Sequence, residues 1–351
     1  MTIHRRQLLA GIAGSAALSS DAFAQTAPAP AYVDIHHHVC PPPLAAAMKR
    51  EGRGRITTLQ ECLDEMDKSG TRLAANTCAS PVDYTHSPGE AQKLIRDCNE
   101  YMAKLRSDYR GRFAVFAMLP LPNTDTAAKG NIDASLKEIA YAYDTLKVEG
   151  IHLYTSAGDK FIGDPFMAPI LEELNRRKAV GKTHPAVNPC CEFPALQKLG
   201  GTGVSELGID TQRAISVYLY SGSAAKYRDI KIIWSHAGGA LLGQLQRYGG
   251  SKVDPKWAKE LPNGADFELK RFYYDTAQAY HPATLAALKA FVANDHILFG
   301  TDWPFVSAAV TAEAIVKTGV FSSAEFAAIR NANARKILNL DRKSTRLNSS
   351  H

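Results

Sequence analysis

The feature that most constrains this chain is a series of eight short apolar runs spread over its 351 residues. The runs are rich in apolar, β-branched or aromatic residues, which favours buried strands. They are Tyr32–His36, Arg72–Cys78, Phe113–Leu119, Gly150–Tyr154, Ala179–His184, Ile230–His236, Phe272–Asp275 and Ile297–Gly300.

Segments with helical periodicity lie in most of the gaps between these runs. They span Leu59 to Lys68, Ala91 to Ser107 and Asp164 to Arg177, and a last one from Ser323 to Leu340 closes the chain. Strand–helix alternation builds parallel sheets with right-handed crossovers, which leaves few topologies. Eight repeats therefore predict an α/β fold, a (β/α)₈ TIM barrel.

The long segment from Pro185 to Gln212 contains Pro189, Pro194 and the pair Gly200-Gly201. These residues favour an active-site loop over a second domain. We therefore expect one barrel domain over residues 32–340.

Both ends of the chain are expected to lie outside this domain. Arg5-Arg6, an apolar stretch from Leu8 to Leu18 and the cleavage signature Ala22-Phe23-Ala24 predict a twin-arginine signal peptide over residues 1–24. The alternative is an amphipathic tail on a cytoplasmic protein. Residues 25–31 read as a linker. Asp341–His351 resembles a translated sequencing-library adapter, so we expect a non-native tail there. The mature protein is thus expected in the periplasm.

Charge and cysteine content exclude several classes of protein. The formal charge is +6, but the first 24 residues carry +1 and the last 11 carry +2, which leaves +3 for the remainder. This balance gives no electrostatic case for binding nucleic acid or an anionic membrane. None of the six cysteines forms a C-x-x-C pair, and we expect buried thiols. Cys40, two residues after His38, is the one expected nearest the site described next.

Three histidines and one aspartate stand at or just past the ends of predicted strands. His36 and His38 share one face of the first strand because strand side chains alternate, so His37 faces the helices. His184 ends the fifth strand, and Asp302 follows the eighth. The carboxyl ends of barrel strands meet at one face, where these groups suit one divalent metal with an open position. Zinc, or a harder ion such as manganese, fits this ligand set.

His236 ends the sixth strand and is followed by Ala237-Gly238-Gly239. The missing side chains of the glycines are expected to leave room for a substrate. A histidine that titrates near neutrality can carry a proton to a substrate carbon. The alternative is that His236 ligates a second metal. Binuclear barrels usually need a carbamylated lysine at the end of strand four, where this chain has His152-Leu153-Tyr154-Thr155.

The chain resembles the metal-dependent amidohydrolase superfamily, in the branch of aminocarboxymuconate-semialdehyde decarboxylase and aromatic-acid decarboxylases of the 6-methylsalicylate type. The matching motifs run from Asp34-x-His36-x-His38 to Asn333-Ala334-Arg335 and cover nearly all of the mature chain. The most specific are Gly163-Asp164-Pro165, Glu173-Leu174-Asn175-Arg176-Arg177, Ser235-His236-Ala237-Gly238-Gly239, Tyr274-Asp275-Thr276-Ala277 and Gly300-Thr301-Asp302-Trp303-Pro304.

The resemblance implies roles for individual residues. The family's metal ligands fall on His36, His38, His184 and Asp302, its proton carrier falls on His236, and its carboxylate-binding arginine falls on Arg247. In relatives that act on phenolic acids, the equivalent of Asp302 also protonates the ring. The resemblance further implies a small carboxylic acid as substrate and a homodimer.

Several assignments keep alternatives at this stage. A guanidinium can hold a carboxylate through two parallel hydrogen bonds, but Arg247 would also be ordinary on a helix surface. Arg53 and Arg55 are weaker candidates for the same contact. Asp275 either orients a metal ligand or caps the following helix.

One residue departs from the family pattern. Relatives carry apolar residues before the histidine of strand five, whereas this chain has Lys182, which would point into the barrel. A buried ammonium group is costly unless it is paired. Either Lys182 pairs with an acid such as Asp34, or the fifth strand is distorted.

The leading hypothesis is a metal-dependent carboxy-lyase that removes CO₂ from an unsaturated or aromatic hydroxycarboxylic acid without oxidation. The main rival is a lactonase-like hydrolase on the same barrel, because the ligand set does not separate the two. A binding protein without catalysis is the rival of a different class; absence of bound metal would favour it.

Overall fold

The computed structural model describes residues 31–51, 57–77, 88–120, 128–157, 159–186, 193–200, 202–249 and 252–340. The predicted signal peptide, nearly all of the linker and the tail after Leu340 lie outside the described residues. So do Arg53, Arg55 and three of the cysteines, Cys78, Cys190 and Cys191.

Eight parallel strands form one sheet in the order β1-β2-β3-β4-β7-β8-β9-β10. They confirm all eight predicted strands, with ends that differ by at most a few residues. The strands are β1 (Tyr32–His38), β2 (Thr71–Thr77), β3 (Phe113–Ala117), β4 (Gly150–Tyr154), β7 (Val180–His184), β8 (Lys231–Trp234), β9 (Tyr273–Asp275) and β10 (Ile297–Leu298). A small hairpin, β5 (Ser156–Ala157) with β6 (Lys160–Phe161), follows β4.

Main-chain hydrogen bonds connect the first strand to the last and close the sheet. The Ile35 nitrogen donates to the oxygen of Phe299 at 2.9 Å, and the His38 nitrogen donates to that of Trp303 at 3.0 Å. Between them, the Asp302 nitrogen donates to the oxygen of His36 at 2.8 Å. The result is the predicted barrel, and its closure places Asp302 directly beside the histidines of β1.

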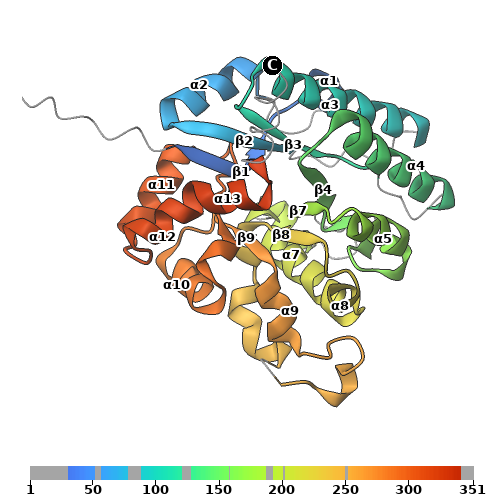
Figure 1. The fold of residues 1–351 in the computed structure, drawn as a ribbon, viewed down its shortest axis with the longest axis vertical. Helices are drawn as coiled ribbons and strands as arrows, with labels where there is room; N and C mark the ends of the chain where they lie inside the picture. Colours follow the sequence, from blue (N-terminus) through green and yellow to red (C-terminus); the bar gives the residue numbers. More distant parts are fainter. Residues whose placement is uncertain are drawn as a thin grey trace, which may run out of the picture.

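Helices surround the strands (Figure 1). Many begin at residues typical of helix starts; for example, Thr58 and Glu61 form a capping box at α2, and Ser322 and Glu325 form one at α12. The helices are α1 (Pro42–Glu51), α2 (Leu59–Ser69), α3 (Pro88–Asp108), α4 (Ala128–Tyr141), α5 (Ala168–Arg176), α6 (Pro194–Lys198), α7 (Thr202–Tyr220), α8 (Ser223–Lys226), α9 (Ala265–Arg271), α10 (Pro282–Phe291), α11 (Ala308–Lys317), α12 (Ser323–Ala327) and α13 (Asn333–Ile337).

The interpretation of residues 185–212 as a loop is wrong over Pro194–Lys198, which form α6, and from Thr202, where α7 begins. The buried face of α7 carries acidic residues, Glu206 and Asp210, one turn apart, before the apolar Ala214 and Tyr218. Acidic residues on the inward face hide the apolar periodicity that predicts a helix. Asp210 is accommodated because it accepts hydrogen bonds from the Thr155 hydroxyl and the Ala186 nitrogen.

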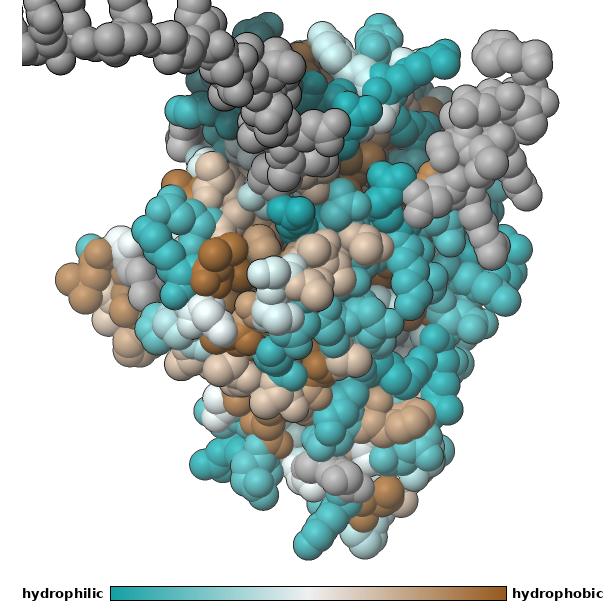
Figure 2. All heavy atoms as spheres, turned by 60° about the vertical axis from the view of Figure 1, so that its left-hand side comes forward, coloured by the Kyte–Doolittle hydropathy of each residue, from teal (hydrophilic) through white to brown (hydrophobic). Residues whose placement is uncertain are grey.

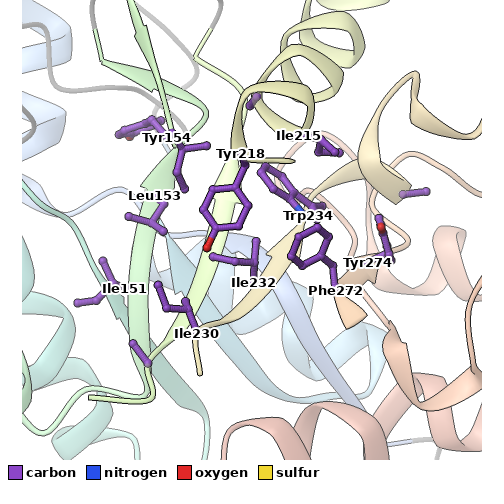
Figure 3. Close-up of a cluster of buried hydrophobic side chains, with 14 of the residues drawn as sticks. Ile151, Leu153, Tyr154, Ile215, Tyr218, Ile230, Ile232, Trp234, Phe272 and Tyr274 are labelled. Atoms are coloured by element: carbon purple, nitrogen blue, oxygen red, sulfur yellow. The ribbon is translucent and has the colours of Figure 1, made fainter. Parts of the chain in front are cut away.

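Apolar side chains fill the layer between strands and helices. Figure 3 shows this layer beside β4 and β8, where Leu153, Ile232 and Trp234 meet Tyr218 of α7. The rings of Tyr218 and Trp234 lie 6.1 Å apart at 73°, an edge-to-face arrangement. This packing holds β4 and β8, which flank the strand that ends at His184, and β8 leads directly to His236.

A second apolar cluster fills the inside of the barrel below the polar residues. It joins Val33, Leu73, Phe116 and Leu298 to Ile337 of α13. Above this cluster, His38 and His184 end their strands and Asp302 follows β10, at the carboxyl end of the barrel, the usual position of an active site in this fold.

On the outer surface, hydrophilic and apolar side chains are interspersed on the face shown in Figure 2. In the described part of the chain, every helix is too short or too polar to span a bilayer.

Candidate active site and metal centre

Four side chains converge at the carboxyl end of the barrel. One ligand atom from each of His36, His38, His184 and Asp302 lies within 4.8 Å of the others. All four side chains are buried. The structure thus brings together the four residues that the sequence indicated as ligands.

Hydrogen bonds fix which ring nitrogen of each histidine faces the centre. Nδ1 of His36 lies 2.9 Å from an Asp275 oxygen, and Nδ1 of His184 lies 2.9 Å from the Pro185 carbonyl. Nδ1 of His38 lies 3.0 Å from Thr77 Oγ1, and that hydroxyl donates onward to the His37 carbonyl. With the proton on each Nδ1, each Nε2 presents a lone pair.

These lone pairs face a carboxylate, which makes the centre fit a cation. Asp302 Oδ1 lies 2.8 Å from Nε2 of His38 and 3.2 Å from Nε2 of His36. Nε2 of His36 is buried without a hydrogen-bond partner. Acceptors this close repel one another unless a positive charge lies among them. Three imidazole nitrogens and one carboxylate are a typical zinc or transition-metal set, and residues that hold each Nδ1 orient the ligands.

The pKa values of the histidines agree with this interpretation. Burial lowers the pKa of His38 to about 4, and it also lowers the pKa of His184. Both rings are therefore neutral near pH 7. His36 differs: burial and Lys182 act to lower its pKa, but Asp275 and Asp302 outweigh them and raise it. A ring between two carboxylates attracts a proton, and a metal ion would take that proton's place.

His236 lies beside the four ligands, outside the ligand group itself. Its ring centre is 4.9 Å from that of His36 and 6.1 Å from that of His184. Its Nδ1 donates to the Ala277 carbonyl at 2.9 Å, which leaves Nε2 free to exchange a proton. Burial lowers its pKa, so the neutral, basic form dominates near pH 7. His236 can therefore accept or deliver a proton next to the metal centre.

Both His236 and Asp302 have left-handed backbone conformations, with φ of 53° and 69°. Such values are uncommon for residues other than glycine and cost energy. Hydrogen bonds hold each in place: the His236 nitrogen donates to Asp275 Oδ1 at 2.8 Å, and the Asp302 nitrogen donates to the His36 carbonyl at 2.8 Å.

The expectation that Gly238 and Gly239 leave room for substrate is corrected by the structure. A Cβ at Gly239 would lie 2.2 Å from the main-chain oxygen of Gly208, and one at Gly238 would lie 3.1 Å from the Tyr274 ring. The glycines permit α7 and Tyr274 to pack closely against the turn after His236. Their role is to position that turn.

Asp275 connects the parts of the site. Oδ2 accepts from Nδ1 of His36, and Oδ1 accepts from the main-chain nitrogens of His236 and Ala277. Burial acts to raise the pKa of Asp275, but Lys182 and His36 outweigh burial and lower it. Asp275 therefore orients His36, as the first alternative predicted. The second alternative is wrong, because the following helix α10 is capped by His281, and Asp275 Oδ1 accepts only within the turn before it.

Lys182 pairs with Asp275, at 3.1 Å, instead of the expected Asp34. Asp34 is already occupied: its oxygens accept from the ring of His37, the Thr301 hydroxyl and two main-chain nitrogens. Strand β7 keeps regular register with β4 and β8, so its lysine is accommodated without distortion.

His37 faces outward, as the alternation of β1 predicts. Its Nε2 lies 3.3 Å from the Cys62 sulfur, and its ring stacks on Trp303 at 4.8 Å. Burial opposes a charge on this ring, but Cys62 and Asp34 outweigh it and raise the pKa of His37 to about 10.

Three polar residues of the site were missed by sequence reasoning. Gln278 donates through Nε2 to Oδ2 of Asp302. Thr77 holds His38, and His152 lies inside the barrel with both ring nitrogens unpartnered. His152 lies within β4, Thr77 ends β2, and Gln278 lies just past β9. Their positions in or near predicted strands are the one signal that could have indicated them.

Two other sequence candidates, Arg247 and Cys40, are not among the four clustered ligand residues. Arg247 is exposed on a 3₁₀ helix, Leu241–Tyr248, that follows the turn after His236. The Cys40 thiol contacts the sulfur of Met48 in α1 at 3.8 Å. Among the described residues, Cys40 is not part of the metal-ligand group.

A (β/α)₈ barrel that carries three histidines and an aspartate at its carboxyl end defines a metal-dependent barrel of the amidohydrolase type. The chain belongs to the amidohydrolase family, whose model matches residues 33–340.

The chain is similar in sequence to several decarboxylases. Decarboxylase yanB of Aspergillus niger is 32% identical over 297 residues, which cover 78% of this chain and 77% of that protein. The 6-methylsalicylic acid decarboxylase of Penicillium expansum is 33% identical over 291 residues, 78% of this chain and 85% of that protein.

Solved structures share the fold at lower identity. The 2,6-dihydroxybenzoate decarboxylase from Rhizobium has a TM-score of 0.74 and 18% identity, and covers 89% of this chain and 99% of that one. A dihydroxybenzoic acid decarboxylase from Polaromonas, solved with manganese and the inhibitor 2-nitroresorcinol, has a TM-score of 0.71 and 20% identity, and covers 89% and 97%.

Proposed function

We propose that this protein is a metal-dependent decarboxylase that removes CO₂, without an oxidant, from an aromatic or unsaturated hydroxycarboxylic acid. The observation that carries the proposal is the placement of His236, a partnered but unligated imidazole, 4.9 Å from the ring of the ligand His36. The names of the two fungal relatives support the same reaction.

The chain's own residues suit this chemistry. A divalent metal held by His36, His38, His184 and Asp302 would supply a Lewis acid for the substrate's oxygens. His236 presents Nε2 because its Nδ1 is bound to the Ala277 carbonyl. A protonated His236 is a stronger acid than free histidine because burial lowers its pKa. Nε2 of His236 takes up a proton from water and passes it to the substrate carbon. That carbon keeps the electron pair of its bond to the carboxylate as CO₂ leaves, so no oxidant or reductant is needed.

Asp302 and Arg247 have supporting parts in this proposal. Asp302, held by the Gln278 amide, ligates the metal and is the second group that can pass a proton to the ring. Arg247, eleven residues beyond His236 in the sequence, is assigned to a substrate carboxylate.

An activity screen tests the proposal. Protein loaded with zinc or manganese is incubated with hydroxybenzoates, 6-methylsalicylate and muconate-type acids, and released CO₂ is measured. Lactones are assayed in parallel for ring opening. CO₂ release from an aromatic or unsaturated acid is the expected result; ring opening without CO₂ release would establish the lactonase-like hydrolase instead.

Three further features remain proposals beside this one: zinc as the resident metal, a homodimer, and export to the periplasm through the twin-arginine signal. Metal analysis of the purified protein, light scattering and cell fractionation test them in turn.

A further inference from the structure

Lys182 is a charged side chain in the barrel interior that the proposed reaction does not use. It lies on β7, two residues before the ligand His184, and its side chain is 0% exposed. In register it neighbours His152 of β4 and Ile233 of β8. Its ammonium group is thus enclosed by the barrel next to the metal ligands.

The contacts of Lys182 hold its ammonium group next to the ligand His36. Nζ lies 3.1 Å from Oδ2 of Asp275 and donates to the Thr183 carbonyl at 3.0 Å. It also lies 3.1 Å from Nδ1 of His36, whose proton is directed to the same Asp275 oxygen. Lys182 and His36 therefore share one carboxylate oxygen.

Stability gives little reason for this lysine. A buried ion pair seldom stabilises more than apolar residues of the same volume, because removing two charges from water is costly. In this chain the buried ion pair lies beside a metal centre. An additional positive charge there weakens the binding of a metal ion and strengthens the binding of an anion.

The first consequence concerns the metal and the second concerns the substrate. A divalent ion, Asp275 and Asp302 together carry no net charge, and Lys182 makes the sum +1. The charge of Lys182 lies 3.1 Å from the ring of the ligand His36, and in a buried site of low dielectric constant it acts strongly on neighbouring charges. It repels the metal ion and draws electron density from the carboxylate that supports His36, and it attracts an anionic ligand.

We propose that Lys182 is a specificity-determining residue that makes this site select anionic aromatic carboxylates over neutral analogues, while weakening its hold on the metal ion. The inference rests on the proposed function for the substrate class. It goes beyond that function in assigning selectivity to a residue whose ammonium group contacts Asp275, the Thr183 carbonyl and Nδ1 of His36.

The first test measures metal affinity by competition with a chromophoric chelator. Lys182→Met removes the charge and keeps the side-chain volume, and Asp275 keeps its partners His36 and two main-chain nitrogens. Lys182→Gln removes the charge and keeps a donor. Lys231→Met is the matched control, because Lys231 starts β8 at the opposite end of the barrel and the same net charge is lost. Both Lys182 variants should hold zinc or manganese more tightly, by about tenfold.

The second test measures ligand binding by calorimetry to the metal-loaded proteins. Salicylate is the anionic probe, and salicylamide is its neutral analogue of similar shape. The ratio of their affinities should fall about tenfold or more in both Lys182 variants and stay unchanged in Lys231→Met.

A purely structural lysine would give a different pattern. Its loss would loosen the metal and weaken both probes equally, and either that result or an unchanged ratio overturns the proposal. If one variant fails to fold, the other gives the same comparison. Neither measurement needs turnover, so failure to release CO₂ refutes the proposed function alone, and an unchanged ratio in an active decarboxylase refutes the Lys182 proposal alone.

Discussion

The carboxylate of Asp275 holds the ring of His36 through a 2.9 Å hydrogen bond to Nδ1. Its other oxygen accepts the main-chain nitrogen of His236 at 2.8 Å. One carboxylate thus sets the orientation of a metal ligand and the unusual backbone conformation of the proposed proton carrier, so metal binding and proton transfer share a single support.

Replacing Asp275 with Asn should weaken metal binding roughly 10–100-fold, because the neutral amide supports His36 less strongly. Chelator competition on purified protein measures this. Asp229→Asn, at an exposed position, is the control for loss of one negative charge. Equal metal retention in the two variants would show that Asp275 does not support the metal ligand.

Replacing His236 with Asn should leave metal content unchanged and lower kcat by about 10²–10⁴-fold. The reason is that His236 exchanges protons and does not ligate the metal. Metal analysis and a CO₂-release assay on the same preparation check both statements. Activity close to that of the unaltered enzyme would remove His236 from the reaction.

The barrel could be predicted from the sequence because each strand is a short apolar run, and such runs depend on local composition. Helix α7 was missed because the local composition of its buried face is not apolar. Glu206 and Asp210 lie on its buried face, where their acceptance depends on Thr155 and other partners distant in sequence. Local periodicity carries no information about those partners.

The ligands could be proposed because histidines and an aspartate at strand ends must meet in a barrel. The pairing of Lys182 could not, since it depends on which carboxylate is still free. Asp34, its expected partner, is already satisfied by His37 and Thr301, so Asp275 takes that place. Likewise, the close contact of Gly239 with Gly208 could not be predicted, because it joins segments about thirty residues apart in the sequence. Gly239 was therefore assigned to substrate space.

Replacing Arg247 with Met should raise KM for the carboxylic acid and leave metal content and the melting temperature unchanged. The side chain is exposed, so its removal creates no cavity. Arg72→Met, at an exposed position early in β2, is the control for loss of one positive charge. A KM equal to that of the unaltered enzyme would exclude Arg247 as the carboxylate-binding residue.

Replacing Gly300 with Ala should disturb the metal centre by steric conflict. The new Cβ would lie 2.8 Å from Cβ of His36 and 3.1 Å from that of Asp275. We expect a loss of roughly 1–3 kcal/mol in the free energy of unfolding, measured by urea on metal-free protein. Faster release of metal to a chelator should accompany it. Gly89→Ala is the control, because its Cβ would meet nothing within 4 Å.

The pair of arginines that ends α5 should make stability depend on pH in acid. Hydrogen bonds from Arg176, opposed by burial and reinforced by Arg177, lower the pKa of Glu173 to about 2, from 4.5 in an unfolded chain. A carboxylate with a lower pKa in the folded state stabilises the folded protein at pH values above the unfolded pKa, and it loses that effect as the pH falls toward 2.

Glu173→Gln lacks the effect at every pH. The difference in melting temperature between the metal-free native protein and this variant should therefore be largest near about pH 6 and shrink toward about pH 2.5. High salt should reduce it at pH 6, because the pair is partly exposed. A difference that is constant from pH 6 to 2.5 would show that the charge of Glu173 does not contribute.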